Sequence, residues 1–173
     1  RKSGLTTTSE LNLGTIDLDL ENSMLNKAFN HDKSPMRIVI VTNADAAMTK
    51  YGKNAPEIIK AQQKQSTDKV MYRGVKWFAD DAFLSLGMVM ENPGYTDGHK
   101  GVWNTPPNEM VEKMLPWWKA NIQINVHSNG NGGNLATLAA LETLMKRQPK
   151  KDHRFTFQHF GMTSPEIIKR VAL

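Results

Sequence analysis

The hydrophobic and polar positions of this chain fall into two patterns that alternate. Short apolar or alternating runs, typical of strands, are each followed by turn residues and then by a longer stretch with helical spacing. The expected strands are Gly4–Glu10, Met36–Asn43, Gly74–Asp80, Asn121–His127 and Arg154–Phe160. Successive runs begin roughly 30 to 50 residues apart, the length of βα units, so the strands are expected to be parallel.

Helices are expected between these runs. A capping residue followed by proline indicates a helix start at Thr105 and another at Ser164. Asn134 is a plausible cap for a third helix, whose apolar face is formed by Leu135, Leu138, Leu141, Leu144 and Met145. Two further helices are expected over Ala55–Gln63 and around Met110–Trp118.

This alternation predicts an α/β fold. Closed eight-stranded α/β barrels average about 31 residues per unit, and the five units found here match that spacing. In such a barrel the chain would supply only part of the structure. An open, doubly wound sheet of five strands fits the same alternation and stays open as the alternative. Because no linker stands out, residues 1–173 are expected to form one partial barrel domain.

Composition narrows the classes of function. The net charge is +5, but the Lys and Arg residues are scattered, so a nucleic-acid partner is disfavoured. The chain has no cysteine, which excludes disulfides and thiolate metal sites. No apolar run approaches the roughly 20 residues of a membrane span, and the N-terminus has no signal-peptide pattern. The compartment is not fixed, with the cytoplasm favoured over the periplasm.

Two histidines stand at positions suited to catalysis. His127 and His159 each lie at the C-terminal end of an expected strand, in consecutive βα units. Because the C-terminal ends of parallel strands gather on one face, both side chains are candidate metal ligands. A hydrogen-bonded structural role stays the alternative for each. His31, His99 and His153 lack this placement and default to loop or surface roles.

A lysine within an apolar strand also needs an explanation. Lys76 lies in the run Val75–Asp80, where burying an ammonium group without a partner would be costly. One explanation is an ion pair with Asp80 or another carboxylate. The other is a lysine with a lowered pKa that reacts with carbon dioxide to form a carbamate, an oxygen ligand for metals.

Two segments next to these residues have unusual composition. The glycine-rich run Asn129–Asn134 follows a strand and opens a helix, but Leu135 replaces the third glycine of a nucleotide-binding turn. We interpret it as a tight turn that brings backbone close to the site near His127. The segment Asp81–Thr105 is long and contains aromatic residues, which favours an ordered lid or pocket wall.

Five runs, in this order, resemble a known family of enzymes. They are Val75–Asp80, Asn92–His99, Trp103–Pro107, Ile124–Gly130 and Asp152–Phe160, and from first to last they span about half of the chain. On these runs the chain resembles the amidohydrolase superfamily, specifically the amidohydrolase 3 group of metal-dependent hydrolases. Gly4–Thr8 looks like the second strand of that family.

The resemblance implies a (β/α)8 TIM-barrel amidohydrolase fold, of which this chain would cover roughly strands 2 to 6. It also implies that Lys76 is carbamylated and that Lys76, His127 and His159 hold one or two divalent metal ions, with zinc as the default. The paired histidines of the family's first strand and the aspartate of its eighth have no counterpart here. The chain by itself is therefore not expected to be a competent enzyme.

The function implied is hydrolysis of an amide or other non-peptide C–N bond in a small-molecule substrate by a metal-activated hydroxide. Within the Asp81–Thr105 loop, Tyr95, His99 and Trp103 are candidate substrate contacts. Asp81, Asn131 and Gln158 depart from the family pattern, which affects the tuning of the site. Whether the protein forms a homo-oligomer is left open.

Two rival functions remain. A regulatory or binding protein could retain the barrel without turnover, because a fold does not determine a function. A basic nucleic-acid-binding domain is the second rival.

Overall fold

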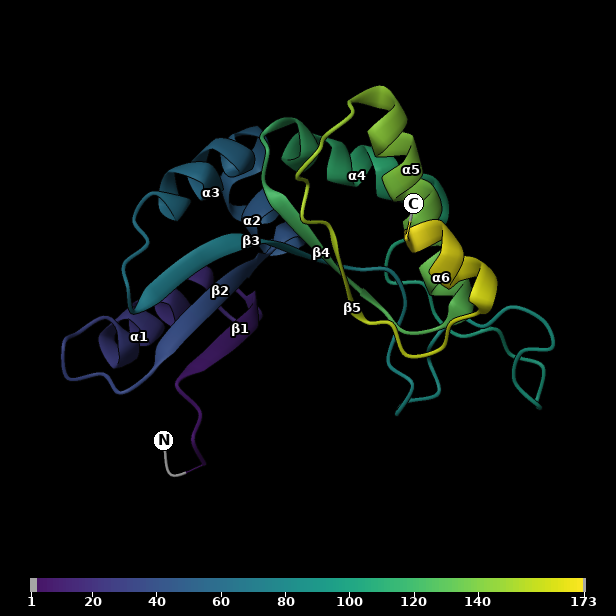
Figure 1. Cartoon of the computed structure of the whole chain (residues 1–173), viewed down its shortest axis with the longest axis horizontal. Coiled ribbons are helices and arrows are strands. Elements are labelled where there is room, and N and C mark those ends of the chain that lie inside the picture. Colours follow the sequence, from purple (N-terminus) through teal and green to yellow (C-terminus); the bar gives the residue numbers. More distant parts are fainter. Residues whose placement is uncertain (1–2, 173) are drawn as a thin grey trace. The chain divides into compact units, whose positions relative to one another are not determined.

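The computed structural model describes residues 3–172, in which strands and helices alternate along the chain (Figure 1). The strands are β1 (Thr7–Leu13), β2 (Arg37–Asn43), β3 (Val70–Phe78), β4 (Gln123–Ser128) and β5 (Thr156–His159). The helices are α1 (Leu18–Phe29), α2 (Ala44–Tyr51), α3 (Ala55–Gln63), α4 (Pro107–Lys119), α5 (Asn131–Arg147) and α6 (Pro165–Val171), with a short 3-10 helix, η1 (Gly52–Asn54), after α2.

The strands form one sheet in the order β1-β2-β3-β4-β5. The β1/β2, β2/β3 and β4/β5 ladders are parallel, as expected for βα units. The α/β class is thus correct, but the expected (β/α)8 TIM barrel is wrong for residues 3–172: they supply five strands, and closure of such a barrel takes eight. The sequential strand order also lacks the reversal that defines a doubly wound sheet.

The chain divides into two compact units. The first unit runs to Lys76 and includes Ala120–Gln123. The second unit holds Trp77–Lys119 and the chain from Ile124 onward. The candidate histidines and the long loop therefore belong to the second unit, while Lys76 belongs to the first.

Strand boundaries depart from the sequence pattern where the backbone turns. Asn121 (φ 57°), Arg154 (φ 50°) and Phe160 (φ 50°) are left-handed, a conformation that interrupts an extended strand. For this reason β4 begins at Gln123, and β5 is shorter than the predicted Arg154–Phe160. The boundaries of β2 differ from the prediction by one residue, at its start. Strand β1 begins later than expected and β3 begins earlier.

Side-chain N-caps account for the starts of α1, α2 and α6. Ser164 caps α6 as expected, since its hydroxyl accepts a hydrogen bond from the Ile167 N–H, and Pro165 follows at the first helical position. Asn134, by contrast, lies inside α5, which begins at Asn131. Helix α4 begins at Pro107, one position later than a cap at Thr105 implies. Within residues 3–172, no helix is both long and apolar enough to cross a membrane.

Each unit has its own buried apolar residues. In the first unit, side chains of β1, β2 and β3 pack together, and Leu25 and Phe29 of α1 pack against them; the strand residues are Leu13, Ile38, Ile40, Val70 and Tyr72. In the second unit, α4, β4 and α5 supply most of the largest buried side chains, Met110, Met114, Trp117, Trp118, Ile124, Leu138 and Leu144, and Trp77 and Ile167 complete them.

Candidate functional site

Two imidazoles meet at the ends of neighbouring strands. His127 lies near the end of β4 and His159 is the last residue of β5, and the parallel ladder pairs Ser128 with His159. The two rings lie edge to face, with centroids 4.5 Å apart. His127 is half-buried, with the Phe78 ring centroid 5.1 Å from its own, whereas His159 is exposed. The predicted convergence of these two side chains is confirmed.

Imidazole nitrogens are good ligands for zinc and similar ions, so the chemistry of this pair fits a metal. The pair is not a complete coordination shell. Among residues 3–172, no group of three or more His, Cys, Asp or Glu side chains is arranged to hold a metal ion. A tetrahedral zinc site takes four ligands, of which these two histidines would supply half.

Lys76 lies in the part of β3 that belongs to the first unit. Its side chain is buried, at 5% exposure. Burial lowers the pKa of the Lys76 amine to about 8, because removal from water disfavours the charged form. Near neutral pH the amine of Lys76 is therefore uncharged far more often than that of a surface lysine.

Asp80, just beyond β3, is completely buried and accepts three backbone hydrogen bonds. Its Oδ2 accepts from the N–H of Val89 (2.9 Å) and of Gly130 (2.8 Å), and its Oδ1 accepts from the N–H of Asn129 (2.8 Å). Its backbone carbonyl accepts from the amide nitrogen of Asn104. One carboxylate thus joins the long loop to the turn between β4 and α5.

Asn129 connects this turn to the first imidazole. Its side-chain nitrogen donates to the carbonyl of Asp81 (3.1 Å) and lies 2.8 Å from Nε2 of His127. An amide nitrogen donates and does not accept, so this contact requires Nε2 to act as the acceptor. The Oδ1 of Asn129 is buried and has no hydrogen-bond partner within the described part of the chain.

The glycine-rich run allows close backbone approach, as the sequence predicted. A Cβ at Gly130 would lie 1.9 Å from the carbonyl oxygen of Val89, and one at Gly133 would lie 2.5 Å from Oδ2 of Asp80. Neither distance is compatible with a side chain unless the neighbouring atoms move. The absence of side chains here lets the long loop and the Asp80 carboxylate pack onto the first turn of α5.

The long loop holds itself together through His99. This ring stacks on Tyr95 with centroids 3.9 Å apart, its Nε2 lies 2.9 Å from the carbonyl of Leu86, and its Nδ1 contacts Asp97. The Leu86 carbonyl and the Asp97 carboxylate both raise the pKa of His99, since they stabilise the protonated ring. No helix or extended strand interrupts the segment between β3 and α4, so its prediction as a loop is confirmed.

Trp103 is the third residue that the sequence singled out in this loop. It is half-buried, and its backbone forms an isolated antiparallel bridge with Asp80. Tyr95 is also half-buried, and its hydroxyl donates to the carbonyl of Met88. All three predicted substrate contacts thus belong to the second unit, together with His127 and His159.

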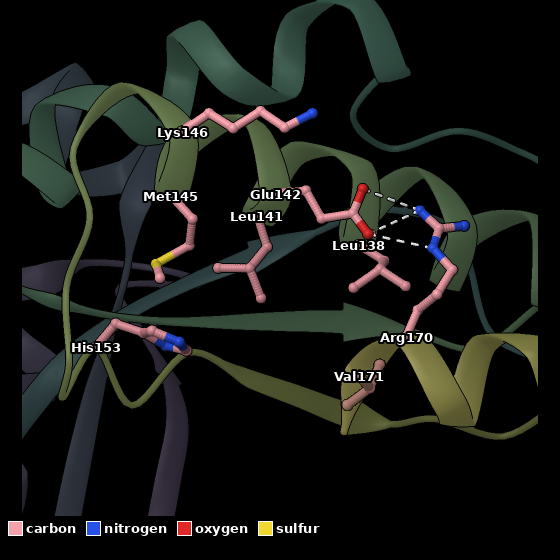
Figure 2. A pocket seen from close by; sticks show the side chains of 8 residues that line it. All are labelled: Leu138, Leu141, Glu142, Met145, Lys146, His153, Arg170 and Val171. Atoms are coloured by element: carbon pink, nitrogen blue, oxygen red, sulfur yellow. Dashed lines mark hydrogen bonds and ion pairs between the residues drawn. The ribbon is translucent and has the colours of Figure 1, made fainter. Parts of the chain in front are cut away.

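A cavity of about 340 Å³ lies elsewhere in the second unit, between α5 and α6 (Figure 2). Its lining includes the apolar side chains of Leu138, Leu141 and Met145. Glu142 and Arg170 form a bidentate ion pair at one side, and the ring of His153 lies at the other (Figure 2). Neither candidate metal-binding histidine lines this cavity.

Comparison with known proteins found no matching family model and no matching curated protein. Two solved structures match. One is an uncharacterized metal-dependent hydrolase from Pyrococcus furiosus, 16% identical with a TM-score of 0.64, and the other is from Pyrococcus horikoshii OT3, 14% identical with a TM-score of 0.69. The chain shares their fold. The alignments cover 94% and 98% of this chain but only 31% and 32% of the two proteins.

These similarities bear on the fold alone, and the amidohydrolase 3 resemblance stays an interpretation of the sequence. Sequence reasoning did not identify the roles of Asp80 and Asn129. The sequence shows only that Asp80 directly follows an apolar run that ends at Ala79, where a buried carboxylate would need donors, and it does not show that those donors are backbone N–H groups. For Asn129 it is a polar side chain at the start of the glycine-rich turn.

Proposed function

We propose that this chain is part of a metal-dependent hydrolase that cleaves amide or other non-peptide C–N bonds in small molecules. The observation that carries the proposal is the pair of imidazoles, His127 and His159, with ring centroids 4.5 Å apart at the ends of adjacent parallel strands. That is the edge at which α/β enzymes bind metals and substrates.

Two further facts support the proposal. Both solved structures that share this fold are metal-dependent hydrolases, although this chain spans 31% and 32% of their lengths. In addition, the five runs that resemble the amidohydrolase 3 group include His127, His159 and Lys76. The choice of C–N bonds rests on that resemblance.

In this proposal His127 and His159 hold the metal through neutral imidazole nitrogens. When bound, the metal supplies Lewis acidity that polarises the substrate carbonyl and makes water a better nucleophile. Zinc is the ion we propose, because the two proposed imidazole ligands suit it and need no thiolate. Phe78 packs beside His127, with the ring centroids 5.1 Å apart and the ring planes inclined by 41°.

Lys76 is proposed as an oxygen ligand after carbamylation. Its uncharged amine would attack the carbon of carbon dioxide, forming an N–C bond and releasing one proton to leave an anionic carbamate. The lowered pKa of about 8 supports this reaction, since only the uncharged amine is nucleophilic. A carbamate also replaces a cation, which a divalent metal would repel, with two oxygen ligands.

The Asp81–Thr105 loop is proposed as a wall of the substrate pocket. Tyr95 and His99 stack on each other and are tied to loop carbonyls, so they would present a fixed surface rather than a mobile one. Trp103 is held next to Asp80 by its backbone. Substrate contacts from these three residues would therefore be pre-organised.

The proposal is tested by removing and restoring the metal in the complete protein. A chelator should abolish hydrolysis of an amide substrate panel, and added zinc should restore it. Dialysis without chelator is the control. Full hydrolysis in protein shown to be metal-free would contradict the proposal.

A non-catalytic binding protein with the same α/β fold is the alternative. It is favoured by one observation, that the described residues bring only two imidazoles together at this edge. A binding protein need not hold stoichiometric zinc, so metal content of the complete protein separates the two functions.

A further inference from the structure

A single carboxylate fastens two segments that come from distant parts of the second unit. Asp80 has no exposed surface, and its two oxygens accept hydrogen bonds from Val89 in the long loop and from Asn129 and Gly130 after β4. Burial of an aspartate away from water is tolerated when such donors replace its hydration. The length of these bonds, 2.8 to 2.9 Å, is typical of charge-assisted hydrogen bonds.

The same carboxylate occupies the N-terminus of α5. Gly130, the residue before this helix, has no side chain to cap it, and the Asp80 carboxylate accepts its N–H instead. A helix N-terminus favours a negative charge. Gly133 in the first helical turn leaves room for the carboxylate, since a Cβ there would lie 2.5 Å from Oδ2.

Asn129 links the Asp80 carboxylate to His127 through hydrogen bonds. The backbone N–H of Asn129 is held by Asp80, and its side-chain nitrogen both donates to the Asp81 carbonyl and contacts Nε2 of His127. Because a carbonyl can only accept, the Asp81 contact fixes which end of the amide faces the imidazole.

This orientation of the amide leaves its oxygen without a partner among residues 3–172. Oδ1 of Asn129 is buried without a hydrogen-bond partner in the described chain. An unsatisfied buried acceptor is unfavourable, and a native protein that keeps one requires an explanation. The orientation of the amide that leaves Oδ1 unpaired is the one that places the side-chain nitrogen 2.8 Å from Nε2 of His127.

We propose that Asp80 is a positioning residue for His127. By holding the backbone of Asn129 it keeps the Asn129 amide against Nε2, and so fixes the orientation of the imidazole ring before any metal binds. The inference rests on the proposed function for what His127 does with that orientation, but the positioning itself is a property of the metal-free chain.

The direct test observes the His127 ring in the metal-free protein by NMR of nitrogen-labelled histidine. Asp80→Asn and Asn129→Ala are each expected to shift the ring-nitrogen resonances of His127, and the double variant should shift them no further than the larger single change. Asp81→Asn is the matched control, since the Asp81 carboxylate bonds to the adjacent Ala82 N–H. Its His127 resonances should stay in place.

Metal affinity provides a second readout. The contact with Asn129 uses the lone pair of Nε2, and a neutral ring then carries its proton on Nδ1, so a metal that binds His127 has to displace the Asn129 amide. Zinc binding to the complete protein should therefore strengthen in Asp80→Asn and Asn129→Ala, and stay unchanged in Asp81→Asn.

Unchanged His127 resonances in folded Asp80→Asn would overturn the inference. If Asp80→Asn does not fold, Gly133→Ala takes its place, because the added methyl group displaces the carboxylate without removing its charge; an unmoved His127 ring there would equally overturn it. If the ring responds as expected but the protein binds no metal, the proposed function fails and the positioning role stands.

Discussion

The rings of His127 and His159 lie edge to face with their centroids 4.5 Å apart, although 31 residues lie between them in the sequence. The parallel ladder between β4 and β5 produces this proximity, because it pairs His127 with Gln158 and Ser128 with His159. Neighbouring parallel strands bring their C-terminal residues to one edge of the sheet.

Burial of Lys76 predicts that stability rises with pH. Its folded-state pKa of about 8 lies below the ordinary value of 10.5, so between these pH values the unfolded chain binds more protons than the folded one. The free energy of unfolding should therefore increase as pH rises through that window, because the unfolded chain loses the proton of Lys76 there. Urea denaturation of metal-free protein below pH 8, inside the window and at its upper end of pH 10.5 measures it.

Lys76→Met is the matched variant, since it keeps the length of the side chain without the charge. The additional stability of the natural protein at high pH should be missing from its pH profile. Parallel profiles for the two proteins would contradict the burial argument.

The loop contacts of His99 predict the opposite pH dependence, a loss of stability as pH rises. Its pKa is raised, chiefly by the Leu86 carbonyl and also by Asp97, so its contribution to stability is present below the ordinary pKa of 6.5 and is lost as pH rises through the raised value. A neutral ring can donate only one of its two hydrogen bonds. Proteolysis within Asp81–Thr105 should therefore be faster at alkaline pH than at pH 5.5, a value about one unit below the ordinary pKa.

His99→Asn tests whether this ring is responsible. In the His99→Asn variant, the rate of cleavage in this loop should no longer change as pH rises through the pKa of His99. His31→Asn, in the first unit, is the control and should keep the pH dependence of the natural protein. A retained pH dependence in His99→Asn would assign the effect to another group.

Glycine at position 130 should be required for packing. A Cβ there would lie 1.9 Å from the Val89 carbonyl oxygen, and backbone cannot move as a flexible side chain can. Gly130→Ala should lower the free energy of unfolding by about 3 kcal/mol, the upper end of the cost of overpacking, because the clash is with backbone. Gly98→Ala is the control: position 98 has open space around it but φ of +85°, so it measures backbone strain alone, about 1–2 kcal/mol. Equal losses in both variants would contradict the steric account.

The sequence predicted the features that depend on residue pattern. His127 and His159 were found because they end apolar runs one βα unit apart, and the glycine-rich turn because only glycine permits close backbone approach. Asp80 was missed because its partners are backbone N–H groups, whose positions no residue identity reveals. The prediction of an eight-stranded barrel was wrong because a repeated spacing indicates the type of each unit but not the number of strands in the sheet.

The central claim is that His127 and His159 hold a metal ion, and the most direct test is the metal content of the complete protein and its variants. The natural protein and the His31→Ala control should carry stoichiometric zinc, while His127→Ala and His159→Ala should each lose most of it, because losing one imidazole leaves an underfilled coordination shell. Unchanged zinc stoichiometry in either variant would contradict the account.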